Sequence, residues 1–270
     1  MNDRETLRQA LCEFIGPFTL VFAGVGSIIA TQSPSSPGGN IVAIALAHGL
    51  AIGLIFCAVG HISGGHFNPA VTLGFLATRR ISVTKAIVYI VAQLLGAIVG
   101  AAVLTLIFPA LGNLGRNNPG INNGVPAMAS GVGAWSGVLL EAVLTFFLMF
   151  VIYGVAVDGR TGKTVAGLAI GLTISMGVFA GGAISGAMMN PSRAFGPAVI
   201  QQDFTGQWIW WLGPIVGAVV AALVFNYLIL EDGALPVAAP AARPESVSQP
   251  PETAAQSTAR SSRAEARRRR

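Results

Sequence analysis

Hydrophobic residues in this chain are gathered in long runs that carry few charges. A helix needs roughly 20 residues to cross about 30 Å of hydrocarbon, and six runs reach that length. They lie near residues 11–30, 41–60, 86–107, 135–157, 165–183 and 207–230. The first run follows Arg4 and Arg8, but it is too long for a signal peptide and contains Glu13, so we expect a retained helix. The pattern predicts an all-α membrane protein with six transmembrane helices.

Composition excludes a water-soluble globule. Hydrophobic residues make up 53% of the chain and charged residues 10%, against roughly 25% charged residues in a soluble domain. The net positive charge is shared between the apolar body and the last 40 residues, so it does not indicate nucleic acid. Residues 231–270 are rich in Ala, Pro, Ser and charge and end in four Arg. We expect them to form a disordered tail.

Basic residues between the runs predict the orientation in the membrane. Arg and Lys precede the first run, separate the second from the third and the fourth from the fifth, and follow the sixth. By the positive-inside rule, we expect both termini, residues 1–10 and 231–270, to be cytoplasmic. The membrane that we expect is the cell membrane, plasma or inner.

Two connections do not have the composition of loops. Residues 61–78 and 184–200 are mostly apolar, are broken by Gly and Pro, and occupy corresponding places in the two halves of the chain. Such interrupted segments are typical of re-entrant half-helices beside a substrate path. We expect the half-helices at residues 69–78 and 191–200.

The two halves are copies of each other. Residues 62–74 match residues 184–196 at six of 13 positions without a gap. Each half, 11–125 and 126–230, contains three spans, an odd number, so the repeat must be inverted in the membrane. Matching GxxxG patterns in the third and sixth spans predict close backbone approach between those two spans.

Each half-helix is expected to begin at an Asn-Pro pair, Asn68-Pro69 and Asn190-Pro191. Asn is a preferred N-cap residue, and Pro is favoured at the first helical position. A capping Asn uses its side-chain carbonyl on the helix and keeps its NH2 group as a donor. In an inverted repeat the two N-termini can meet at mid-membrane, with two amide donors and two positive dipole ends. A water there would accept two hydrogen bonds, which opposes a proton wire. The positive potential of the two dipole ends would repel cations.

The irregular backbone before each half-helix cannot face lipid, because its carbonyls would lack donors. We expect these carbonyls to line the solute path. They belong to Gly64, Gly65, His66, Gly186, Ala187 and Met188. Glu13 and Glu141 lie inside spans, where an unpaired acid is costly. Their symmetric positions favour a structural task, accepting backbone N–H groups of the two loops, over a proton relay.

The segments SGGHFNPAVTLG and SGAMMNPSRAFGPA, with the inverted six-span plan, resemble the aquaporin (major intrinsic protein) family over about residues 8 to 230. The resemblance implies a homotetramer with one pore per subunit and a selectivity filter outside the central Asn pair. The implied filter residues are His48, Val178, Ala187 and Arg193, with Gly177 or Met176 as alternatives to Val178. Ser192 replaces the Ala of the family motif and adds a hydroxyl near the pore centre.

The resemblance also bears on the solute. Ala194 stands directly after the filter arginine, where glycerol-conducting members typically have Asp, so the sequence predicts a passive water channel that excludes protons and ions. The filter resembles that of plant tonoplast intrinsic proteins, which adds ammonia and hydrogen peroxide as possible permeants. The alternatives are a glycerol or small-solute facilitator and an ion-coupled secondary transporter. No catalytic, phosphate-binding or metal-ligand constellation occurs in the sequence, so we expect neither an enzyme nor a cofactor.

Overall fold

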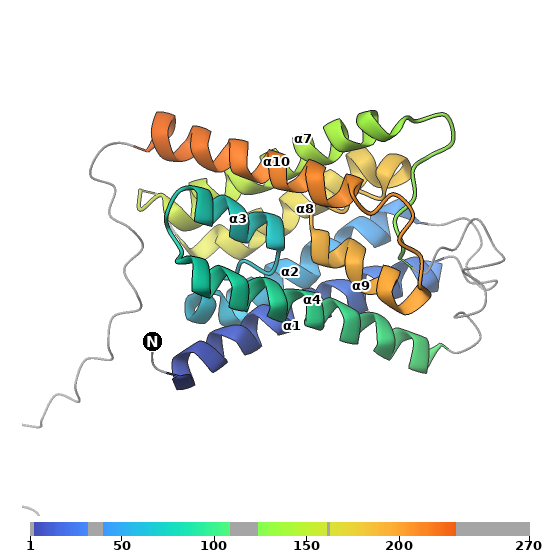
Figure 1. Cartoon of the computed structure of the whole chain (residues 1–270), viewed down its shortest axis with the longest axis horizontal. Coiled ribbons are helices and arrows are strands. Elements are labelled where there is room, and N and C mark those ends of the chain that lie inside the picture. The colour runs from blue at the N-terminus through green and yellow to red at the C-terminus, as the bar shows by residue number, and fades with distance from the viewer. Residues whose placement is uncertain (1–2, 32–39, 109–123, 161–162, 231–270) are drawn as a thin grey trace, which may run out of the picture. The chain divides into compact units, whose positions relative to one another are not determined.

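The computed structural model of the chain describes residues 3–31, 40–108, 124–160 and 163–230 (Figure 1). Every element among these residues is a helix or a turn. The predicted tail, 231–270, lies outside the described residues. Six of the helices are long and apolar enough to cross a membrane, so the predicted all-α membrane architecture is the one observed.

The long helices agree with the predicted runs and extend some of them by a turn or two. They are α1 (Asp3–Thr31), α2 (Ile41–Ser63), α4 (Val83–Ile107), α7 (Ala134–Ile152), α8 (Ala166–Ser185) and α10 (Ile209–Val224). Helices α7 and α10 each continue into a π-helical turn, at Tyr153–Val157 and Phe225–Ile229. A short 3-10 helix, Lys163–Val165, precedes α8. The two half-helices are α3 (Pro69–Ala77) and α9 (Pro191–Gln201).

The long helices pack in three main pairs, α1 with α4, α7 with α10, and α2 with α8. Glycines allow the close approach in the first two pairs. A Cβ at Gly96 would clash with the Phe14 carbonyl of α1, and a Cβ at Gly217 would clash with the Ala142 carbonyl of α7. The GxxxG patterns of the third and sixth spans therefore do not face each other, and that prediction is wrong. Each one packs on the first span of its own repeat.

The half-helices connect the two repeats. Helix α3 of the first repeat packs on α10 of the second, and α9 of the second repeat packs on α4 of the first. Figure 1 shows α3 beside α10 and α9 beside α4. A Cβ at Gly74 of α3 would lie 3.1 Å from the Ala218 carbonyl, so only a residue without a side chain fits well there. This exchange brings the two half-helix N-termini together between the repeats.

Candidate functional site

Both Asn residues have the N-cap geometry that the sequence predicts. Asn68 and Asn190 have extended backbones, and each is followed by Pro at the first helical position. The side-chain Oδ1 of Asn68 accepts from the backbone N–H of Ala70 at 2.9 Å, and Oδ1 of Asn190 accepts from the backbone N–H of Ser192 at 3.0 Å. Each side-chain carbonyl therefore satisfies a free N–H group in the first turn of its own half-helix.

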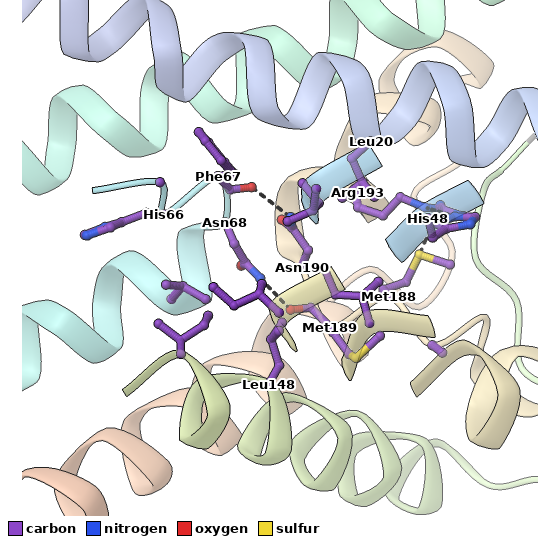
Figure 2. Close-up of a pocket in the computed structure, with 17 residues that line it drawn as sticks. Leu20, His48, His66, Phe67, Asn68, Leu148, Met188, Met189, Asn190 and Arg193 are labelled. Atoms are coloured by element: carbon purple, nitrogen blue, oxygen red, sulfur yellow. Dashed lines mark hydrogen bonds between the residues drawn. The ribbon is translucent and has the colours of Figure 1, made fainter. Parts of the chain in front are cut away.

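The two amides are also bonded across the repeat. Nδ2 of Asn68 donates to the carbonyl of Met189 at 2.7 Å, and Nδ2 of Asn190 donates to the carbonyl of Phe67 at 2.9 Å (Figure 2). An amide NH2 group has two N–H donors, so one donor of each Asn is used and one remains for a solute. The sequence predicts a donating amide at each Asn but carries no signal for the Phe67 and Met189 carbonyls, because these contacts depend on how the repeats meet.

The hydroxyl of Ser192 bonds to the Asn of its own motif. It is fully buried and donates to Oδ1 of Asn190 at 2.7 Å. Ala70 occupies the same position of the first motif and has no such group. The additional hydroxyl therefore holds the amide of Asn190 in its capping orientation, and it does not line the central cavity.

The two buried acids hold the loops that precede the half-helices. Glu141 accepts from Ser185 Oγ at 2.6 Å and from the backbone N–H groups of Met188 and Met189 at 2.9 and 2.8 Å. Both Glu141 and Glu13 are fully buried. Each of these two loops is therefore fixed by hydrogen bonds to one buried carboxylate.

Glu13 makes the corresponding contacts in the first repeat. It accepts from Ser63 Oγ at 2.7 Å and from the backbone N–H groups of His66 and Phe67 at 3.0 and 2.7 Å. A fourth donor, Nε2 of Gln93, approaches Glu13 at 2.7 Å. The sequence prediction missed Gln93, whose amide in the middle of an apolar span could have been noticed for that reason.

An elongated cavity runs between the helices past the two Asn side chains. Its walls include Ile52 and Ile170 from the long helices and Val71 from α3. Among the residues expected to present carbonyls, Gly65, His66, Ala187 and Met188 line it. Gly64 and Gly186 do not, because they are the left-handed caps that end α2 and α8.

His66 lies on the cavity wall on the opposite side of the Asn pair from His48 (Figure 2). Its ring stacks on Phe75 at 4.4 Å between centroids, and Nδ1 lies 3.1 Å from Thr72 Oγ1. Gln93 also donates to that hydroxyl. The ring is therefore held by a buried polar network that reaches Glu13.

Three of the four residues expected at the filter line the cavity, namely His48, Ala187 and Arg193. Val178 is buried but does not line it, and Ile174, one helical turn earlier on α8, does. The prediction of Val178 at the filter stays a prediction, and Ile174 is an additional residue of α8 on the cavity wall. Of the two alternatives, Met176 is largely exposed on the outer surface, and Gly177 packs behind Met189.

His48 is held at both ring nitrogens. Nδ1 lies 2.8 Å from the carbonyl of Ile44, which can only accept, so Nδ1 carries the proton. Nε2 is then an acceptor, and it receives the Nε and Nη2 donors of Arg193 at 3.2 and 3.1 Å. His48 therefore orients Arg193 and has no free donor for a solute. Figure 2 shows the two side chains next to each other.

Two further groups hold the other end of the guanidinium. Nη1 of Arg193 donates to the carbonyl of Gly124 at 2.8 Å and to Sδ of Met188 at 3.1 Å. An arginine has five N–H donors, and these four contacts leave one, on Nη2, for a passing solute. Arg193 has no carboxylate partner among the described residues. Gly124 lies far from the motifs in sequence, and nothing in the pattern marks its carbonyl.

Two oppositely directed half-helices that meet end to end beside a mostly apolar cavity, with a few polar groups on its wall, define a membrane channel protein. The family described as Major intrinsic protein matches residues 1–225. The chain belongs to this family.

The individual proteins to which this chain is similar support the same family assignment. Aquaporin TIP4-4 of Zea mays is 44% identical over 86% of this chain and 90% of its own length. Probable aquaporin TIP3-2 of Arabidopsis thaliana is 41% identical over 84% of this chain and 85% of its own length. Among solved structures, the aquaglyceroporin from Plasmodium falciparum aligns with a TM-score of 0.74 and 26% identity, over 83% of this chain and 97% of that one.

These relatives correct the expected location. Relatives with the TIP designation are tonoplast intrinsic proteins, which belong to the vacuolar membrane. The expectation of a cell membrane, plasma or inner, is therefore wrong. The relatives do support the other part of that expectation, that the chain is an integral membrane protein.

Proposed function

We propose that this chain is a passive channel for water that excludes protons and ions. The observation that supports it best is the meeting of Asn68 and Asn190, each with one amide donor left after its cross-repeat bond. A water between these donors accepts from both and cannot pass a proton along the file. The two half-helix N-termini add positive potential at the same point, which opposes cations.

The test is osmotic shrinkage of proteoliposomes followed by stopped-flow light scattering. Vesicles that contain the protein should shrink at least about tenfold faster than empty vesicles, with no saturation and no dependence on an ion gradient. Shrinkage at the rate of empty vesicles would overturn the proposal. Flux that saturates and follows an ion gradient would identify the secondary transporter instead.

Ammonia and hydrogen peroxide are the further solutes that we propose. The cavity wall includes Ala187, whose side chain is a single methyl group. One N–H of Arg193 remains for a small polar solute. Glycerol is the competing solute, since a solved relative is an aquaglyceroporin. Glycerol uptake as fast as ammonia uptake in the same vesicles would favour that alternative.

Replacing His48 by Phe tests the filter directly. The larger ring narrows the path, and Arg193 loses the acceptor of two of its donors. We expect uptake of ammonia and peroxide to fall by about tenfold, equivalent to about 1.4 kcal/mol, and water flux to fall less. The measurement is the ratio of ammonia-driven alkalinisation to osmotic shrinkage in the same vesicle preparation. An unchanged ratio would show that His48 does not contribute to solute selection at the filter.

We also propose a homotetramer, as the family resemblance implies. Large apolar side chains are exposed along the long helices, including Leu54 and Leu139 at 64% and 66% exposure. In a membrane such surfaces meet lipid or another copy of the chain. Light scattering on the detergent-solubilised protein, with the detergent contribution subtracted, should give the mass of four chains. A monomer mass in mild detergent would contradict this.

A further inference from the structure

Gly24, in the C-terminal third of α1, is in direct contact with His48 although it belongs to none of the expected filter positions. It is buried, and a Cβ built on it would lie 2.5 Å from Nε2 of His48, 2.6 Å from Cδ2 and 2.8 Å from Cε1. Non-bonded atoms in proteins do not approach a Cβ this closely. The imidazole of His48 therefore occupies the space that any other residue at position 24 would fill with its side chain.

The backbone does not explain a glycine at this position. Gly24 lies within a regular α-helix and is absent from the residues with positive φ. A glycine inside a helix costs about 1 kcal/mol relative to alanine. The requirement at position 24 is therefore for space beside the imidazole, and not for backbone freedom.

The imidazole cannot move aside without losing its partners. Its Nδ1 is bonded to Ile44 and its Nε2 to Arg193, and only 4% of His48 is exposed. Displacement away from α1 moves the ring off the position in which Nε2 receives the two Arg193 donors. The position of the guanidinium therefore depends on the small volume of Gly24.

The inverted repeat supplies a comparison within the same chain. Matching Glu13 with Glu141 places Gly24 opposite Ile152, and matching Ser63 with Ser185 places His48 opposite Ile170. Both isoleucines line the cavity. One repeat thus combines a residue without a side chain and a large polar ring, and the other combines two branched apolar residues. The second repeat therefore does not pair a ring with a residue that lacks a side chain.

We propose that Gly24 is a positioning residue of the selectivity filter, which seats the His48 imidazole against α1 and thereby sets the direction of the Arg193 guanidinium and the width of the path. This inference rests on the proposed channel function. It adds a position on the first helix to the residues that determine which solutes pass.

The experiment compares Gly24→Ala with Gly26→Ala, His48→Ala and the double variant Gly24→Ala/His48→Ala. Gly26 is a matched control on the same helix, because a Cβ there would lie 3.5 Å from Leu104 Cδ2, an ordinary contact. Each variant is reconstituted at equal density. Water permeability per channel and the ratio of ammonia to water permeability are then measured by stopped flow.

Gly24→Ala should lower water permeability per channel by at least about threefold and shift the ammonia-to-water ratio by a similar factor. Gly26→Ala should match the parent protein. In the His48→Ala background the added methyl has room, so Gly24→Ala should change both quantities by less than about 1.5-fold. A Gly24→Ala protein that is poorly folded should regain its thermal stability in the double variant.

Two results would overturn the inference. One is a well-folded Gly24→Ala protein with the permeability and solute ratio of the parent. The other is an equal loss of permeability or stability from Gly24→Ala whether or not His48 is present, since that would show an effect on helix packing alone. Failure of the channel function itself is distinguishable, because the parent protein would then show no water flux above empty vesicles.

Discussion

Replacing Arg193 by Ala is expected to raise the leak of protons and small cations through the channel by up to about 10³-fold while water flux is maintained. A unit charge about 4 Å from a permeating cation repels it by about 4 kcal/mol at an effective dielectric constant of 20, and each 1.4 kcal/mol corresponds to a factor of ten. The substitution also frees Nε2 of His48 and widens the path. The Asn pair remains as the second barrier, so the full factor is an upper bound.

The measurement is the decay of a pH gradient across proteoliposomes under a clamped membrane potential, beside osmotic shrinkage of the same vesicles. Arg193→Lys is the matched variant, because it keeps the charge but has no planar group that can donate to His48, Gly124 and Met188 at the same time. It should retain most of the proton exclusion and lose solute discrimination. An Arg193→Ala channel that is as proton-tight as the parent would show that the Asn pair alone accounts for exclusion.

Replacing Glu141 by Ala is expected to destabilise the whole fold. The change leaves the hydroxyl of Ser185 and the N–H groups of Met188 and Met189 buried without an acceptor. At about 1–3 kcal/mol for each unsatisfied donor, the free energy of unfolding should fall by about 5 kcal/mol. For a chain of this size, that lowers the melting temperature by about 10–20 °C.

Thermal unfolding in detergent, followed by tryptophan fluorescence and by monodispersity on gel filtration, measures this effect. Glu5→Ala is the control, since Glu5 is exposed on the first turn of α1, where it accepts a hydrogen bond from Gln9 at 3.2 Å. It should change the free energy of unfolding by less than about 0.5 kcal/mol. A Glu141→Ala protein with the melting temperature of the parent would mean that the loop holds its shape without the carboxylate.

Much of the fold could be predicted because its signals are local. A run of about 20 apolar residues in a membrane has to be a helix, since lipid offers no partner for backbone polar groups. Asn68-Pro69 and Asn190-Pro191 mark helix starts for reasons within the residues themselves. The odd number of spans in each half then requires inversion. These arguments need no knowledge of which helices touch.

The parts that could not be predicted depend on how segments far apart in sequence meet. The family resemblance implies Val178 at the filter, but only the structure shows that Ile174 of α8 lines the cavity. GxxxG patterns show that a helix has a close neighbour but do not say which one. The contacts of Arg193 with Gly124 and Met188 carry no sequence pattern at all, because carbonyl and thioether acceptors are recognised only by position.

The sequence by itself determined six spans, two half-helices, an inverted repeat and the residues at its centre, since each follows from hydrophobic length, capping chemistry or internal matching. Only the tertiary structure decided that each Asn gives one donor to the opposite loop, and that His48 orients Arg193. It alone also decided that Gly24 provides the space for the imidazole. The reason is physical: the sequence sets which groups must be buried or capped, whereas hydrogen bonds and steric limits between distant segments exist only after the helices have packed.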